Sequence, residues 1–124
     1  MEIPEFGSSI NEKRAYLAAC GCNKIDTLPR HMVQTVCDYL LFGLPCGGFL
    51  TALFSNDLKE SFGRADDANA SHMRNWVLFM YNEMPSISQG SREKVAEWIK
   101  RGGLLGDVAG TASPDDERFY GAEP

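Results

Sequence analysis

The stretch Gly43-Leu44-Pro45-Cys46-Gly47-Gly48-Phe49-Leu50, which continues to Asn56-Asp57-Leu58, decides how this chain folds. Apolar residues recur at helical spacing on both sides of it. A glycine after a helix readily adopts the left-handed conformation that ends the helix, and a proline two residues later prevents the helix from resuming. The chain must therefore bend here, and we expect Gly47-Gly48 to let the helices approach closely at the corner.

Outward from this bend, apolar periodicity and capping residues predict helices on both sides. They span about residues 10–20, 29–42, 49–62, 66–84 and 92–101. The third is either one continuous helix or two short ones separated at Ser55-Asn56-Asp57, because Asn and Asp are only mildly unfavourable inside a helix. No alternating β-branched run and no Asn-Gly or Asp-Gly hairpin turn occurs. The predicted fold is therefore all-α, a compact bundle of about five helices.

The same periodicity predicts which side chains face the core. Leu58 and Phe62 are expected to face inward. The inner face of the first helix is predicted to carry Ala15, Tyr16, Ala19 and Cys20, and that of the longest helix Met73, Trp76, Val77, Met80 and Met84. The longest helix is also apolar at Leu78, Phe79 and Tyr81. A helix that is apolar on nearly all sides is usually buried centrally or covered by a partner.

Composition divides the chain into three parts. Residues 1–9, broken by Pro4 and Gly7, are predicted to be an irregular arm, residues 10–105 a single helical domain, and residues 106–124 a disordered acidic tail. Five acidic residues and one arginine lie from Asp107 onward, so the tail carries four of the five net negative charges. The pair Phe119-Tyr120 within it is either a docking motif or part of an inert tail.

The charge pattern and the N-terminus restrict the partners. The body is close to neutral, which argues against a basic groove that follows nucleic-acid phosphates. The first residues lack the basic and apolar regions of a signal peptide. The longest apolar run, Trp76 to Tyr81, has six residues, whereas about 20 are needed to span a bilayer. We therefore expect a cytoplasmic protein with reduced thiols and no membrane partner.

No residue pattern indicates an enzyme or a cofactor. A zinc site built from Cys20, Cys22, Cys37 and Cys46 with His31 is disfavoured, because zinc ligands usually come in two close pairs and only one C-x-C pair is present. The histidines, His31 and His72, do not stand in a Cys-His or Ser-His context. Gly47-Gly48 lacks the following Lys-Ser/Thr of a phosphate-binding loop. We predict buried thiols, no metal, no cofactor and no enzymatic activity.

A polar set after the bend is the first candidate for binding. It comprises Asn56, Asp57, Lys59, Glu60 and Arg64, of which Glu60 and Arg64 are spaced for an i, i+4 ion pair. The favoured interpretation is a hydrogen-bond network that ties the corner to the long helix, and the other is a recognition surface. The candidate partner-binding residues are this set together with Phe79, Tyr81 and Asn82.

The segment from Leu28 to Leu104 carries a more specific pattern. It reads Gly43-x-Pro45-x-Gly47-Gly48-Phe49-Leu50-x-Ala52, Asn56-Asp57-Leu58, Arg64-Ala65-Asp66, Tyr81-Asn82-x-x-Pro85 and Gly90-Ser91-x-Glu93-x-Val95-x-x-Trp98. This pattern resembles a small protein family encoded in phages and prophages. The resemblance implies a phage origin, and hence the host cytoplasm, and one common fold. It implies no chemistry, since the family has no established activity.

Two functional hypotheses follow. The first is a phage accessory protein that binds a host or phage protein, modulates a host factor or host defence, and forms a homodimer. It rests on the small size and the surplus apolar surface of the Trp76–Tyr81 segment. The alternative is a small helical nucleic-acid-binding protein that uses the last helix, Arg92–Arg101. Its basic patch would consist of Arg74, Arg92, Lys94, Lys100 and Arg101.

Overall fold

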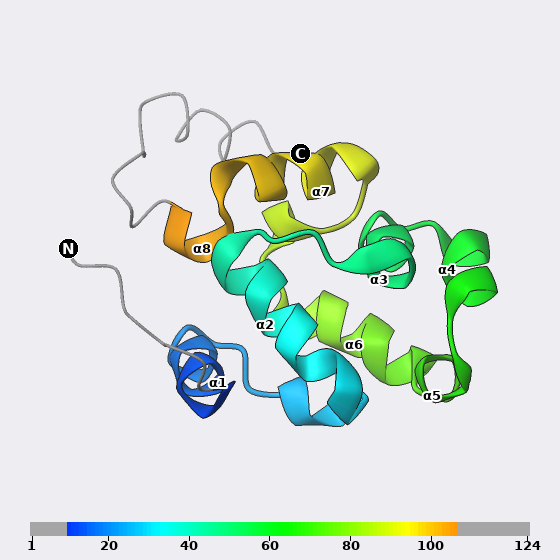
Figure 1. Cartoon of the computed structure of the whole chain (residues 1–124), viewed down its shortest axis with the longest axis horizontal. Helices are drawn as coiled ribbons and strands as arrows, with labels where there is room; N and C mark the ends of the chain where they lie inside the picture. Colours follow the sequence, from blue (N-terminus) through cyan, green and yellow to red (C-terminus); the bar gives the residue numbers. More distant parts are fainter. Residues whose placement is uncertain (1–9, 107–124) are drawn as a thin grey trace.

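Regular secondary structure is entirely helical in residues 10–106, which are the residues that the computed structural model describes (Figure 1). The α-helices in this part are α1 (Ile10–Ala19), α2 (Val33–Phe42), α3 (Gly47–Phe54), α4 (Leu58–Arg64), α5 (Asp67–Ser71), α6 (Met73–Glu83), α7 (Arg92–Arg101) and α8 (Gly103–Gly106). Three short 3-10 helices, η1 (Ile25–Thr27), η2 (Arg30–Met32) and η3 (Ser86–Ser88), connect them. The predicted all-α class is confirmed.

The predicted number of about five helices is wrong, because two predicted helices are split and one is added. The segment after the bend forms two helices, α3 and α4, with Asn56 at φ +65° between them. The long helix is interrupted at His72, whose ring Nδ1 lies 2.8 Å from the carbonyl oxygen of Ala68. Residues after Gly102 form α8. The predicted arm and the tail from residue 107 lie outside the described residues, and Gly106, assigned to the tail, ends α8.

Two glycines place α8 directly against the end of α2 (Figure 1). Gly43 ends α2 with φ +68°, as predicted, and Gly103 begins α8 with φ +71°. A Cβ atom on Gly103 would lie 2.6 Å from the backbone nitrogen of Gly43 and 2.8 Å from the carbonyl oxygen of Leu41. The two backbones therefore touch with no side chain between them. The close approach that we expected at Gly47-Gly48 is present at Gly48, where a Cβ would lie 3.0 Å from the Arg64 guanidinium, and the backbone-to-backbone contact at Gly43 and Gly103 is a second one.

The core is built around α2, which crosses the middle of the molecule (Figure 1). Tyr39 of α2 stacks on Phe54 of α3 with ring centroids 5.0 Å apart. Its hydroxyl donates a hydrogen bond to the carbonyl oxygen of Ser88 (2.6 Å), and its own carbonyl accepts one from the indole Nε1 of Trp98 (2.7 Å). On the other side of Phe54, Trp76 of α6 packs against Phe49 at 5.7 Å. One buried aromatic cluster thus joins α2, α3, α6 and α7.

Several side chains face the opposite way from the prediction. Leu58 and Phe62 of α4 are exposed, and Val77 of α6 is exposed while its neighbour Phe79 is only 1% exposed. In α1 the fully covered side chains are Lys13 and Leu17 rather than the predicted alanines and Cys20. The ammonium of Lys13 is accommodated there by an ion pair with Asp38 at 2.8 Å. The outward apolar side chains on α4 and α6 are therefore surplus to the core.

Within the described residues, no single helix is long and apolar enough to cross a membrane. Taken together, Arg30–Phe42 and Gly47–Phe54 have the length and apolar composition of a membrane-spanning segment, but the two helices meet at a bend of 57°.

Candidate functional site: an apolar groove between α4 and α6

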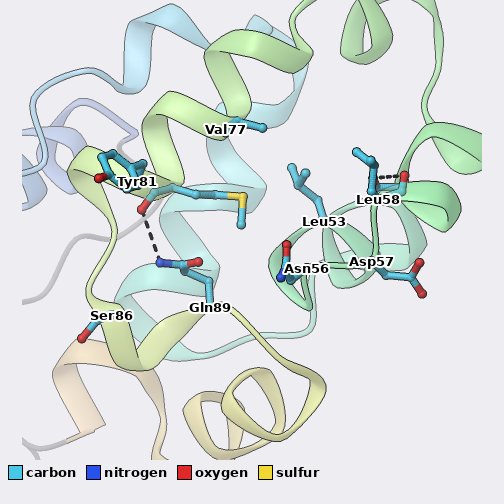
Figure 2. A pocket seen from close by; sticks show the side chains of 10 residues that line it. Leu53, Asn56, Asp57, Leu58, Val77, Tyr81, Ser86 and Gln89 are labelled. Carbon is cyan, nitrogen blue, oxygen red and sulfur yellow. Dashed lines mark hydrogen bonds between the residues drawn. The ribbon is translucent and has the colours of Figure 1, made fainter. Parts of the chain in front are cut away.

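Leu58 of α4 and Val77 and Tyr81 of α6 lie around a groove of about 430 Å³ (Figure 2). We call it the α4–α6 groove. It is lined by Leu53, Asn56, Asp57, Leu58, Ser61, Val77, Met80, Tyr81, Ser86 and Gln89. Three of these side chains are large, apolar and accessible to solvent: Leu58 is 65% exposed, Val77 49% and Tyr81 85%. The groove is therefore an apolar surface that no other described part of the chain covers.

One wall of the groove is a face of α6. Val77, Met80 and Tyr81 are spaced i, i+3, i+4, which places them on one side of the helix. Trp76 and Phe79 of the same helix are buried in the core. Helix α6 is thus apolar toward the core and toward the groove, which is the structural basis of the apolar surplus seen in its sequence.

The opposite wall comes from the bend between α3 and α4, where Leu53 and Leu58 point toward α6 (Figure 2). The Asp57 carboxylate accepts a hydrogen bond from the backbone N–H of Glu60 (3.2 Å) and thereby caps α4. The same carboxylate pairs with Arg92 of α7 at 2.8 Å. We predicted a hydrogen-bond network that ties the corner to the long helix, whereas the Asp57 carboxylate ties the corner to α7.

The candidate binding residues are distributed over three places. Asn56, Asp57 and Tyr81 line the groove. Lys59, Glu60 and Arg64 are exposed on α4, where Glu60 and Arg64 form the predicted pair at 2.5 Å. Asn82 borders a separate pocket of about 240 Å³ near Lys24. Phe79 borders that same pocket, although its side chain is only 1% exposed.

Sequence reasoning missed Leu58, Val77, Met80 and Gln89 as groove residues. For α6 a signal was present, because an all-round apolar helix has more apolar side chains than one core face can take. For Leu58 and Gln89 no local signal exists, since their positions depend on how α4 and the loop before α7 pack.

Two substitutions at Asn56 separate what its backbone conformation contributes to stability from what its side chain contributes. Its φ of +65° is a conformation that Gly adopts freely, Asn tolerates and most other residues resist. We expect Asn56→Ala to lower the free energy of unfolding by about 1 kcal/mol and Asn56→Gly to leave it nearly unchanged. Urea denaturation followed by circular dichroism measures both. Equal losses in the two variants would mean that the amide side chain, not the backbone, holds the bend.

Three of the four cysteines, Cys22, Cys37 and Cys46, are poor nucleophiles near neutral pH. Burial raises the pKa of the Cys22 thiol to about 12 and those of Cys37 and Cys46 to about 11. Such thiols stay protonated near neutral pH, and the thiolate is the reactive form. Cys20 alone among the four is exposed. Residues 10–106 contain no group of three or more His, Cys, Asp or Glu side chains that could hold a metal ion.

These pKa values predict the reactivity of the thiols. At pH 8 the native protein should react with a thiol reagent rapidly at Cys20 and slowly at Cys22, Cys37 and Cys46, because a raised pKa leaves little thiolate until the pH approaches it. In denaturant all four should react at similar rates. Peptide mass spectrometry after timed alkylation identifies the modified residues. Rapid native labelling of Cys22 would contradict its burial.

The histidines are engaged in local contacts at helix ends. His31 Nε2 lies 2.9 Å from the carboxylate of Asp66, which also caps α5 by accepting a hydrogen bond from the Asn69 N–H. That backbone hydrogen bond, helped by His31, holds the pKa of the Asp66 carboxyl below its ordinary value. His72 contacts the Ala68 carbonyl and the Ser71 hydroxyl. Both histidines therefore have structural contacts of their own.

The basic side chains of α7 are largely used within the fold. Arg92 pairs with Asp57, and Lys94 Nζ lies 3.3 Å from the Ser86 carbonyl oxygen. The Arg101 guanidinium lies over the Trp98 ring at 4.9 Å. The same helix carries exposed Glu93 and Glu97. This arrangement does not present a continuous row of cations to a phosphate backbone.

Comparisons with known proteins do not assign the chain to a family. No protein-family model matches it, and no curated protein and no solved structure gives a significant match. The resemblance to a phage family accordingly remains a prediction.

Proposed function

We propose that this is a phage-encoded accessory protein of the host cytoplasm that acts by binding a host or phage protein and thereby modulates a host factor or host defence. The observation that supports binding is the α4–α6 groove, where Leu58, Val77 and Tyr81 stand exposed around an apolar hollow. The phage origin rests on the sequence resemblance. The absence of enzymatic activity stays a prediction.

The energetics favour an apolar helical segment as the ligand. Fully burying a side chain the size of Val or Leu contributes about 1.5–3 kcal/mol, and covering the exposed parts of Leu58, Val77 and Tyr81 contributes a share of this at each position. An amphipathic helix laid in a groove presents apolar anchors at i, i+3, i+4 and i+7. The i, i+3, i+4 wall of α6 is complementary to such a pattern.

The nucleic-acid alternative has weaker support, since the cations of Arg92–Arg101 pair within the fold or alternate with acids. Phosphate contacts strengthen as salt is lowered. Titrating labelled duplex DNA across a salt series therefore tests the alternative directly. Salt-dependent binding that is lost in Lys100→Glu would favour it over the protein partner, and no binding at low salt removes it.

The proposal is tested by comparing two double variants of α6. Val77→Ser/Tyr81→Ser changes the groove wall, and Leu78→Ser/Asn82→Ala changes the neighbouring exposed face of the same helix as a matched control. Affinity capture from phage-infected host cells nominates a partner, which is then purified and titrated calorimetrically. We expect the groove variant to weaken binding at least tenfold, about 1.4 kcal/mol, and the control to bind like the wild type.

Equal weakening by both variants, or unchanged binding by the groove variant, would overturn the groove as the binding surface. The proposal itself would be overturned if the full chain captured no protein from infected cells that also binds it in the titration. Sedimentation of both variants also tests the predicted homodimer. A dimer dissociated only by Val77→Ser/Tyr81→Ser would make a second copy the occupant of the groove.

A further inference from the structure

We infer that a second copy of this chain occupies the α4–α6 groove, with Phe62 of each copy inserted between the walls of the other copy's groove. The contact is reciprocal, so the pair has two-fold symmetry and contains two identical Phe62 contacts. Only the role of the groove as a site for an apolar helix is taken from the proposed function. The helix that fills it is α4 of the second copy.

Helix α4 turns its apolar residues away from the core of its own chain. Its large apolar residues, Leu58 and Phe62, are 65% and 49% exposed, whereas its buried residue is Ser61. The Ser61 hydroxyl donates a hydrogen bond to the Leu58 carbonyl oxygen at 2.8 Å, so this inward polar group has its partner within α4. An amphipathic helix normally buries its apolar side. The outward row of α4 is therefore a surface that needs a cover.

The row on α4 has the spacing that the groove accepts. Leu58 and Phe62 are four residues apart and lie on one side of the helix. The α6 wall of another copy presents Val77, Met80 and Tyr81 at i, i+3 and i+4. Leu58 lines the groove of its own chain, across from Val77 and Tyr81 (Figure 2), but Phe62 does not line it. Phe62 is therefore left over for the groove of another copy, where its aromatic ring buries a large apolar area.

The exposed apolar area is of the size that a homodimer needs. The groove and the row on α4 together expose four large side chains: Leu58, Phe62, Val77 and Tyr81. Their accessible parts come to roughly 300–500 Å², taking about 150–250 Å² for a whole aromatic side chain and about 60–120 Å² for a whole Val or Leu. A standard interface buries about 800 Å² per partner, of which about 65%, or roughly 500 Å², is apolar in homodimers. The four side chains therefore supply more than half of that apolar area.

The charges around this face nearly cancel. Helices α4 and α6, the cap of α4 and the first turn of α7 carry five cations and four carboxylates: Lys59, Arg64, Arg74, Arg92, Lys94, Asp57, Glu60, Glu83 and Glu93. Asp57 pairs with Arg92 at 2.8 Å, and Glu60 pairs with Arg64 at 2.5 Å. A face with a large excess of one sign repels an identical face. This nearly neutral face accepts a second copy and offers little attraction to a strongly acidic or basic partner.

Helix α4 is held at both ends, so it serves as an anchor without first having to be ordered. At its start, Asp57 caps the helix and pairs with Arg92 of α7. At its end, the Arg64 guanidinium packs on Gly48 of α3, where a Cβ would lie 3.0 Å from it. A segment that is already fixed in its bound conformation loses little conformational entropy on association.

A single substitution separates the anchor from the groove. Phe62→Ser removes the anchor and leaves every residue that lines the groove in place. Leu44→Ser is the matched control, because Leu44 is 48% exposed and lies in the loop between α2 and α3, outside the groove. Sedimentation equilibrium of the full chain over a range of concentrations measures the dissociation constant of the dimer. We expect Phe62→Ser to raise it at least tenfold, since each dimer loses two anchors, and Leu44→Ser to leave it unchanged.

Mixing two defective chains tests whether the contact is reciprocal. Phe62→Ser keeps an intact groove, and Val77→Ser/Tyr81→Ser keeps an intact anchor. A mixed pair therefore regains one complete contact, whereas a pair of either variant alone has none. We expect the mixed pair to associate at least tenfold more tightly than either variant by itself. A fluorescent label on one variant lets sedimentation velocity follow the mixed pair.

A wild-type chain that stays monomeric at every concentration would overturn the inference. A mixture that associates no more tightly than its components would also overturn it, as would equal weakening by Phe62→Ser and Leu44→Ser. All the substituted side chains are exposed in the described part of the chain, so each variant should fold like the wild type. Circular dichroism spectra and urea unfolding midpoints check this before the association is measured.

Partner binding by Phe62→Ser separates this inference from the proposed function. Its groove is intact and no longer covered by a second copy, so a partner that uses the groove should bind it at least as tightly as it binds the wild type. A monomeric wild type that binds a partner through the groove overturns the inference and leaves the proposed function standing. A dimer with the expected mixing behaviour that captures no other protein supports the inference and refutes the proposed function.

Discussion

Gly103→Ala is expected to cost roughly 2–5 kcal/mol of the free energy of unfolding. The left-handed conformation at φ +71° accounts for about 1–2 kcal/mol of this when a Cβ is present. The rest comes from overpacking, at about 1–3 kcal/mol, because the new Cβ would lie 2.6 Å from the Gly43 nitrogen and 2.8 Å from the Leu41 carbonyl oxygen. These are backbone atoms of the core helix α2, so they cannot rotate away as a side chain would.

Urea denaturation followed by circular dichroism measures this loss, and Gly63→Ala is the matched control. Gly63 lies in α4, and a Cβ there would meet no atom within 4 Å. The same chemical change should therefore stabilise α4 by up to about 1 kcal/mol through helix propensity. A Gly103→Ala protein as stable as the wild type would show that α8 does not dock on α2.

Trp98→Ala is expected to be comparably damaging, at about 3–5 kcal/mol. The indole is fully buried in α7, and its Nε1 donates a hydrogen bond to the Tyr39 carbonyl oxygen at 2.7 Å. Removing the ring opens a cavity beside Tyr39 and also leaves that carbonyl without its donor. Because typical domains are stable by only about 5–15 kcal/mol, this one substitution removes a large part of the total.

Trp98→Phe separates the two contributions, since it keeps most of the ring volume and loses the N–H donor. We expect it to cost about 1–3 kcal/mol, the penalty for an unsatisfied buried polar group. Thermal and urea unfolding of both variants, each followed by circular dichroism, give the comparison. Equal losses for Phe and Ala would mean that the hydrogen bond, rather than the packing, carries the contribution of Trp98.

Features encoded in neighbouring residues were predictable from the sequence. Gly43 ends α2 in the left-handed conformation, and Ser91 caps α7 through a hydrogen bond from the Lys94 N–H, both as their local patterns indicate. Asp66 caps α5, and Glu60 pairs with Arg64 one helical turn away. Each of these interactions joins residues only a few positions apart, so residue type and spacing suffice to specify it.

Features that depend on packing were not predictable. Phe79 and Val77 are both apolar and two positions apart, and only the packing of α6 on Phe49 and Phe54 decides which one is buried. Leu58 faces outward because α4 lies on the outside of α3, which no pattern within α4 encodes. The same limit applies to the groove, since three of its residues were identified from the sequence but their meeting across α3, α4 and α6 was not.

The contact of Gly43 with Gly103 also has a consequence during translation. About 60 residues separate the two glycines along the chain, so a nascent polypeptide that has just completed α2 has nothing to cover that end of the helix. Leu41 and its neighbours stay exposed until residues up to Gly106 have been synthesised. Closure of this end of the core therefore waits until α8 has been synthesised, and a ribosome stalled before Gly103 would carry an incompletely folded, aggregation-prone chain.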